Sequence, residues 1–202
     1  MRILMISIDR TLLGTDYSGD VLERHQKYAQ LAGKLDIIVL SKKAQSSDRV
    51  KSFSKNKISP ELTVYPTNSS RKINYISDVF EIAKKIYWPD KFHLIVTQDP
   101  FLTGLAGWLI KKRFKVPLLV HFHGDFWRNK YWLRERWFNP MFLVLSKFLI
   151  KGADGIRVVS SGIKKKLIKA GIDKSKIKVI QIFWYIKNAF KTICNSLCTI
   201  EY

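Results

Sequence analysis

Short apolar runs, each stopped by a polar or turn-forming residue, alternate along this sequence with stretches in which apolar residues recur at helical spacing. Apolar runs of this length are typical of strands buried on both faces of a sheet. Because helices separate the runs, right-handed crossover connections must join the strands. We therefore predict an α/β fold with a doubly wound parallel sheet of about six to seven strands and helices on both faces. The predicted strands are residues 3–8, 36–40, 62–65, 92–97, 118–122, 154–161 and 176–180.

Residues 1–180 are expected to form one Rossmann-like domain, and residues 181–202 differ from them in composition. The final segment contains no glycine or proline and holds both cysteines, Cys194 and Cys198. We expect it to be an atypical end, as a frameshift or an early stop would produce. The alternative is an amphipathic tail with an apolar side. The predicted helices of the domain are residues 21–31, 74–87, 102–114 and 163–170.

The charge of the chain indicates an anionic partner. Thirty-six Lys and Arg residues stand against 16 Asp and Glu residues, which gives a formal net charge of +20. Such an excess attracts a membrane surface, a nucleotide or phosphorylated substrate, or nucleic acid, and charge alone does not choose among them. No apolar run is long enough to predict a membrane span, and no secretory signal is visible. We expect a cytoplasmic protein that is soluble or peripheral on the inner face of the membrane.

The candidate site follows the predicted strand 118–122. His123, Gly124 and Asp125 come directly after this apolar run, where the strand should end. In an open α/β sheet the carboxyl ends of the strands form the ligand crevice. We therefore name His123 as the candidate catalytic residue and all three as candidate substrate-binding residues. Turn formation and helix capping are the alternative roles for these residue types.

Basic and aromatic residues interleave after the candidate site. Residues 126–178 contain 14 Lys and Arg residues against three acidic ones. A helix with basic and aromatic faces suits an anionic membrane interface, and an ordinary core helix with a solvated basic face is the alternative. The residues expected to face a membrane are Trp127, Arg128, Lys130, Trp132, Arg134 and Arg136.

The order of several motifs resembles the N-terminal half of a GT-B glycosyltransferase of family 4. The matching stretches read RILMIS, GDVLERH, VHFHGD and ADGIRVVSS, followed by a lysine-rich helix and the last predicted strand. In that family two Rossmann-like domains face each other, and the N-terminal domain mainly holds the acceptor. By position, the resemblance implies that Gly19 lies near the phosphates of the donor and that His123 reaches the transferred sugar. Ser160 and Ser161 would line the same cleft, although helix capping also explains these two serines.

The resemblance implies transfer of a sugar from a nucleotide-sugar donor to a glycan or lipid-linked acceptor, in surface polysaccharide or glycolipid synthesis. It implies no cofactor, no metal and no protein nucleophile. The donor domain of the family should begin after Ile180, where only 22 residues remain. We therefore expect weak or absent donor binding and no turnover by this chain alone.

Two other interpretations remain. The chain could be a non-enzymatic basic domain that binds membranes or nucleic acid. Nucleic acid is the weaker of these partners, because the sequence matches no RNA- or DNA-binding motif that we know. Alternatively, the chain could be a subunit whose site is completed by a separate donor-binding protein.

Overall fold

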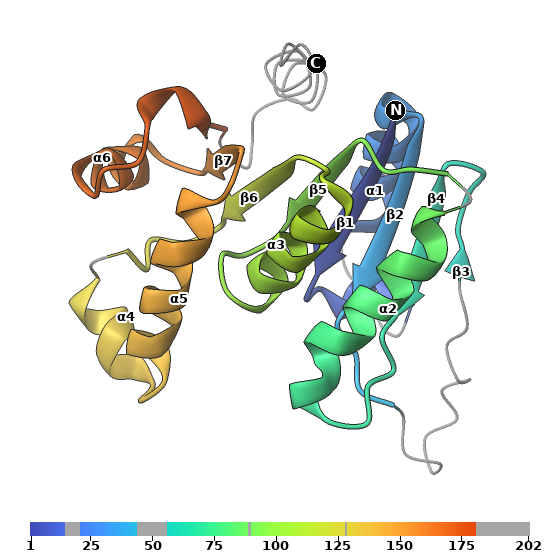
Figure 1. Ribbon diagram of the computed structural model, residues 1–202, viewed down its shortest axis with the longest axis horizontal. Helices are drawn as coiled ribbons and strands as arrows, with labels where there is room; N and C mark the ends of the chain where they lie inside the picture. Colours follow the sequence, from blue (N-terminus) through green and yellow to red (C-terminus); the bar gives the residue numbers. More distant parts are fainter. Residues whose placement is uncertain (15–20, 44–55, 89, 128, 181–202) are drawn as a thin grey trace.

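The structure is a computed structural model that describes residues 1–14, 21–43, 56–88, 90–127 and 129–180. Within these ranges one sheet has the strand order β3-β4-β2-β1-β5-β6-β7-β8 (Figure 1). All of its strand pairs are parallel except the pairing of β3 with β4, which confirms the predicted fold. The strands are β1 (Arg2–Ser7), β2 (Lys34–Val39), β3 (Asn56–Lys57), β4 (Leu62–Pro66), β5 (Leu94–Thr97), β6 (Leu118–Phe122), β7 (Gly155–Val158) and β8 (Ile177–Val179).

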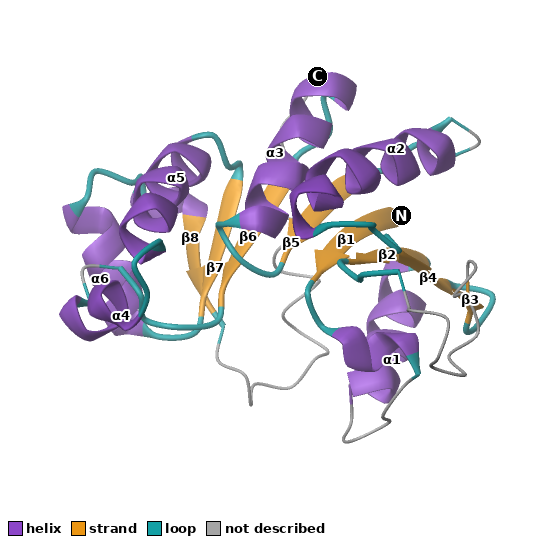
Figure 2. Cartoon of the chain, turned by 90° about the horizontal axis from the view of Figure 1, so that it is seen from below, coloured by secondary structure: helices purple, strands orange, loops and turns teal. Residues whose placement is uncertain are grey.

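Helices cover the two faces of the sheet unequally. Residues of α2, α3, α5 and α6 share one apolar core with one face of the sheet, whereas α1 and η1 share the second core with the opposite face. Figure 2 shows α1 below the sheet and α2, α3 and α5 above it. The helices are α1 (Val21–Ala32), α2 (Tyr75–Tyr87), α3 (Leu102–Phe114), α4 (Lys130–Glu135), α5 (Asn139–Lys151) and α6 (Ser161–Lys169), with the 3-10 turns η1 (Arg10–Leu13), η2 (Lys72–Asn74) and η3 (Lys174–Lys176).

The chain reverses its direction of travel across the sheet between β1 and β5. From β1 it proceeds outward to β2 and β4, and from β5 it proceeds the other way to β6, β7 and β8. The backbone N–H of Ile8, after β1, donates to Oε1 of Gln98, after β5, over 3.0 Å. Ligands of open α/β sheets bind at the carboxyl ends of the strands beside such a reversal. A ligand site is therefore expected at the loops that follow β1, β5, β6 and β7.

Helix α3 lies very close to the sheet because two of its glycines have no side chain. A Cβ at Gly107 would lie 2.5 Å from Cγ2 of Thr97 on β5, and one at Gly104 would lie 2.9 Å from the carbonyl oxygen of Asp99. Side-chain atoms do not approach one another this closely in packed proteins. The small residues in this apolar stretch thus allow the close helix-to-sheet contact expected from the sequence, and the contact fixes the loop between β5 and α3.

A buried ion pair joins β1 and β2 near the amino ends of the strands. Nε of Arg2 donates to Oδ2 of Asp36 over 2.6 Å, and both side chains are almost fully buried. The guanidinium also donates to the carbonyl oxygens of Ile86 and Asp90. Burial, followed by the charge of Asp36, raises the pKa of Tyr65 to about 12. The buried charges of Arg2 and Asp36 therefore neutralise each other at the amino ends of β1 and β2, on the edge of the sheet opposite the candidate site.

Candidate functional site

His123 lies directly beyond the carboxyl end of β6 and is exposed to solvent. The sequence predicts this position for His123, because the apolar run that forms β6 ends at Phe122. Its ring makes an edge contact with the ring of His121, with 5.7 Å between the ring centroids. The predicted position of the candidate imidazole, at an open edge of the sheet, is therefore the observed one, and its role stays a prediction.

A second basic side chain approaches the histidines from the neighbouring strand. Arg157 on β7 is in register with His121 on β6, and its Nη1 lies 3.5 Å from Nδ1 of His121. His121 is buried and Arg157 is half-buried. No carboxylate of the described residues forms a salt bridge with Arg157. We call His121, His123 and Arg157 the basic cluster. The guanidinium of Arg157 gives it a positive charge that suits an anionic group of a ligand.

The basic cluster keeps its imidazoles neutral. Loss of water contact and then the charge of Arg157 lower the pKa of His121 well below the ordinary value of 6.5. The pKa of His123 is also lowered, by partial loss of water contact, then by Arg157 and by Arg24 of α1. A lowered pKa means that the ring stays unprotonated at pH values where a free histidine would take up a proton. Both rings are therefore neutral hydrogen-bonding groups near pH 7.

Replacing Arg157 by Gln is expected to raise the pKa of both His121 and His123, because it removes a nearby positive charge from each ring. NMR titration of the histidine ring signals would measure both values. Arg24→Gln is the matched control: it should raise the pKa of His123, on which Arg24 acts, and leave that of His121 nearly unchanged. Unchanged titration of both rings in Arg157→Gln would contradict this description of the cluster.

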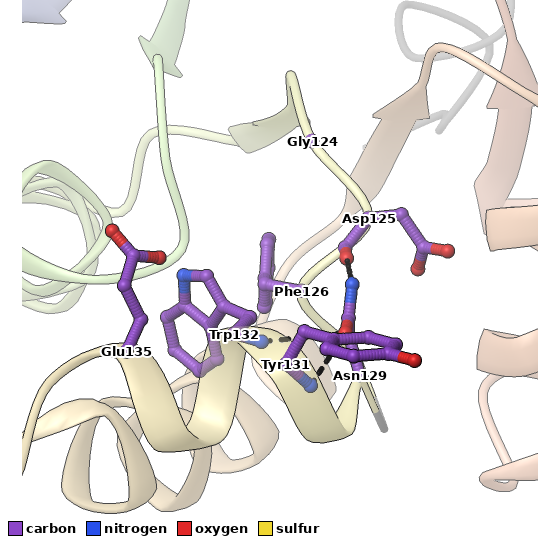
Figure 3. A pocket seen from close by; sticks show the side chains of 7 residues that line it. All are labelled: Gly124, Asp125, Phe126, Asn129, Tyr131, Trp132 and Glu135. Atoms are coloured by element: carbon purple, nitrogen blue, oxygen red, sulfur yellow. Dashed lines mark hydrogen bonds between the residues drawn. The ribbon is translucent and has the colours of Figure 1, made fainter.

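A hollow of about 430 Å³ opens beside the loop that carries His123 (Figure 3). Asn129 links the β6 loop to the start of α4 at this hollow. The side chain of Asn129 donates to the carbonyl oxygen of Asp125 over 2.8 Å and accepts from the backbone N–H groups of Tyr131 and Trp132, which caps α4. The lining residues are Gly124, Asp125, Phe126, Asn129, Tyr131, Trp132 and Glu135.

The other predicted substrate-binding residues have mixed positions. Oδ2 of Asp125 forms an ion pair of 2.7 Å with Lys166, so this carboxylate links the β6 loop to α6. Ser160 is the N-cap of α6, and its hydroxyl accepts from the N–H of Ile163 over 3.3 Å. Ser161 is exposed in the first turn of α6. Gly19 lies outside the described residues.

Of the residues expected to face a membrane, Trp127 is buried and Trp132 is half-buried. Trp127 is only 2% exposed and belongs to the main core. Trp132 is half-buried, because its ring stacks on Phe101 with 5.6 Å between centroids and an interplanar angle of 11°. The prediction for Trp127 was therefore wrong, whereas Trp132 also lines the hollow and its predicted role stays a prediction. Lys130, Arg134 and Arg136 are exposed as expected, and Arg128 lies outside the described residues.

Comparison with known proteins decides the family. Residues 25–182 match the family described as Glycosyltransferase Family 4. This chain belongs to Glycosyltransferase Family 4. The match runs from within α1 to beyond β8, and thus includes the β6 loop, the basic cluster and the hollow. A comparison with curated proteins found no match.

Solved structures share the fold of this family 4 chain at low sequence identity. A sucrose-phosphate synthase structure from Thermosynechococcus elongatus has a TM-score of 0.65 at 15% identity, with 96% of each chain covered. A lipopolysaccharide outer core galactosyltransferase, WaaB, has a TM-score of 0.56 at 13% identity, covering 90% of this chain and 45% of that one. HepE of Anabaena in complex with UDP has a TM-score of 0.55 at 14% identity, covering 98% of this chain and 50% of that one. The chain therefore spans about half the length of the last two.

Sequence reasoning did not single out several residues of this family 4 site. His121 and Arg157 come together only because β6 and β7 pair in parallel register, which a sequence without pairing information does not reveal. Asn129 and Glu135 line the hollow because a short helix follows the β6 loop. An asparagine just before a helical stretch is a capping signal that could have marked the start of α4.

Neither a membrane span nor a metal cluster is found in the parts of the chain that the structure describes. No helix there is long and apolar enough to cross a bilayer. Within the same residues, no group of three or more His, Cys, Asp or Glu side chains could hold a metal ion.

Proposed function

We propose that this chain forms the acceptor side of a glycosyltransferase cleft. A sugar would pass from a nucleotide-sugar donor to a glycan or lipid-linked acceptor, in surface polysaccharide or glycolipid synthesis at the inner face of a membrane. The observation that carries the proposal is the exposed imidazole of His123 at the carboxyl end of β6, in a chain of Glycosyltransferase Family 4. The complex of HepE with UDP and the lipopolysaccharide galactosyltransferase WaaB, which share this fold, support the classes of donor and acceptor.

In this proposal His123 hydrogen-bonds the transferred sugar from the acceptor side. A neutral imidazole both donates and accepts one hydrogen bond, which suits a sugar hydroxyl. Sugar transfer from a nucleotide sugar releases a nucleoside diphosphate, so negative charge grows on the leaving group. The half-buried guanidinium of Arg157 beside the two histidines supplies positive potential for that charge. We assign no protein nucleophile to the reaction.

The hollow beside the β6 loop is the proposed acceptor position. Its walls combine aromatic faces, from Phe126, Tyr131 and Trp132, with the carboxylate of Glu135. Aromatic faces pack on the apolar side of a sugar ring, while carboxylates accept hydrogen bonds from its hydroxyl groups. Gly124 lies at the rim nearest β6, and Figure 3 shows it between the end of that strand and Asp125. An acceptor in the hollow would therefore reach the edge where His123 lies.

We expect no detectable sugar transfer by the purified chain alone. Holding donor and acceptor in a reactive arrangement accounts for much of the rate enhancement in such reactions, and one wall of a cleft does not hold both. The assay would follow labelled nucleotide sugars into the lipid and glycan fractions of cells of the source organism. It would compare the chain alone with the chain mixed with a separately expressed donor-binding domain of the same family from that organism.

The proposal predicts label transfer only in the mixture, and only millimolar or weaker binding of nucleotide sugars to the chain alone by calorimetry. Transfer by the isolated chain, or micromolar donor binding to it, would show that the chain holds the donor itself. Absence of transfer with every donor-binding domain, together with no binding of acceptor fractions, would contradict the proposed function.

A further inference from the structure

A row of basic residues crosses the three strands at one end of the sheet. The register places His121 of β6 beside Arg157 of β7, and Arg157 beside Lys178 of β8. We call these three residues the basic row. Because successive side chains of a strand point to opposite faces, the row lies on the face of the sheet that bears α1. Its neighbours along the strands belong to the main core on the other face: Val120, Phe122, Ile156, Val158 and Ile177.

The apolar core on the α1 face ends before the basic row. Within the described residues, this second core includes Leu119 of β6 and takes no residue from β7 or β8. Helix α1 packs on β2 and β4, and Figure 2 shows it below β1 and β2, away from β7 and β8. His121 is buried, Arg157 is half-buried and Lys178 is exposed. The row therefore leads from the core to the surface.

The basic row carries positive charge without an acidic partner. Neither Arg157 nor Lys178 forms a salt bridge with a carboxylate in the described part of the chain. Burial lowers the pKa of Arg157, Tyr28 opposes this effect, and the charge of Arg24 on α1 lowers the pKa further. Like charges on neighbouring strands repel, and a half-buried ion has lost part of its hydration. A bound anionic group would offset both costs.

The row begins beside the residue that contacts the transferred sugar in the proposed function. The ring centroids of His123 and His121 are 5.7 Å apart, and Nη1 of Arg157 lies 3.5 Å from Nδ1 of His121. A leaving group at His123 accounts for positive potential next to this ring. It does not account for the continuation of the row to Lys178, because β8 lies two strand spacings, roughly 10 Å, from β6.

Positive charge also approaches His123 from the opposite side. The charges of Arg157 and of Arg24 on α1 both lower the pKa of this ring after the effect of burial, so both groups lie near it. A negative group on the transferred sugar itself, on the side of β7, accounts for the part of the positive region that extends along the basic row.

We propose that the transferred sugar is a uronic acid, whose carboxylate binds Arg157 and Lys178 of the basic row. A guanidinium offers two parallel N–H groups to the two oxygens of a carboxylate, and an ammonium adds a compact charge. The neutral ring of His121 can donate one further hydrogen bond. This inference rests on the proposed function, because it names the sugar that His123 contacts.

The carboxylate is not altered by the reaction. Transfer breaks the bond between the anomeric carbon and the diphosphate oxygen, and forms a bond from that carbon to the acceptor oxygen. The proton of the acceptor hydroxyl passes to the released diphosphate. The basic row thus selects and orients the sugar, and supplies no reacting atom.

Methyl glucuronoside and methyl glucoside are matched probes, because they differ only in a carboxylate against a hydroxymethyl group. Each would be titrated into the full chain while the histidine ring signals are followed by NMR. We expect the glucuronoside to shift the signals of His121 and His123, and the glucoside to shift them much less. The signal of His93, at the opposite edge of the sheet before β5, should not move with either probe.

Charge-matched variants separate the basic row from the general positive charge of the protein. Arg157→Gln/Lys178→Gln should bind the glucuronoside at least about tenfold more weakly, because it removes the charged hydrogen-bond donors. The control Arg113→Gln/Lys84→Gln removes two exposed positive charges from α3 and α2, and should bind like the unaltered chain. Equal binding by the two variants, or equal shifts with the two probes, would overturn the inference. Shifts with inorganic pyrophosphate and none with the glucuronoside would also overturn it, by identifying a phosphate site.

A transfer assay distinguishes failure of this inference from failure of the proposed function. The chain mixed with the donor-binding domain would receive UDP-glucuronate or UDP-glucose, and the ratio of the two transfer rates would be measured. Arg157→Gln should lower the ratio of uronate to glucose transfer at least about tenfold, whereas Arg113→Gln should leave it unchanged. An unchanged ratio in Arg157→Gln would overturn the uronic acid alone. Glucuronoside binding at the row without transfer of any sugar would contradict the proposed function instead.

Discussion

Asp36→Ala is expected to lower the free energy of unfolding by about 3–5 kcal/mol. The substitution removes the carboxylate that accepts from Nε of Arg2 over 2.6 Å and leaves the guanidinium in a region where its side chain is only 6% exposed. Removal of the short buried partner is costly because the carboxylate that remains near Nε, Oδ2 of Asp90, is 3.6 Å away and 49% exposed, so it compensates the buried charge only weakly. The backbone carbonyl oxygens of Ile86 and Asp90 also remain as acceptors for the guanidinium.

Urea unfolding monitored by circular dichroism would measure the change. The matched control is Lys27→Ala, which breaks an equally short ion pair, 2.5 Å to Glu23, whose side chains are 54% and 66% exposed. Exposed pairs of this spacing contribute about 0.3–0.5 kcal/mol. A loss in Asp36→Ala no larger than that in Lys27→Ala would show that the pair is not the buried charge contact described here.

The sheet could be predicted from the sequence because its strands are short apolar runs with clear ends. The run before His123 stops at the last residue of β6, and α3 occupies the predicted range. The small antiparallel strand β3 was not predicted, since two residues in a polar stretch give no periodic signal. Helix α6 begins at Ser161 with Ser160 as its cap, two residues before the predicted start at residue 163, because two neighbouring serines are equally good capping residues.

The place of the candidate site in the sheet could be predicted from the sequence, but the residues that surround His123 there could not. A polar group after a buried strand pointed to His123, and the structure places that ring at the open edge. The contact between Arg157 and His121 depends on strand register, which no local pattern encodes. Likewise, the aromatic residues after the site could be assigned to a surface or a core only by packing. The ring of Trp132 stacks on Phe101 and is half-buried, whereas Trp137 is exposed.

His123→Ala is expected to lower the rate of sugar transfer by about 10²–10³-fold, the usual effect of removing a hydrogen bond that the enzyme makes to the reacting group in the transition state. The stability of the fold should change little, because the ring is exposed and ends a strand rather than filling the core. His93→Gln is the matched control. It changes an exposed histidine at the start of β5, on the opposite edge of the sheet, where Nδ1 accepts from the backbone N–H of Arg2.

The rate of label transfer from nucleotide sugars, measured for the chain together with a donor-binding domain, tests the central claim most directly. The account predicts that the unaltered chain and His93→Gln support similar rates, while His123→Ala supports a rate lower by about two orders of magnitude or more. Equal rates for His123→Ala and His93→Gln would contradict it, because the imidazole at the end of β6 would then have no part in the transfer.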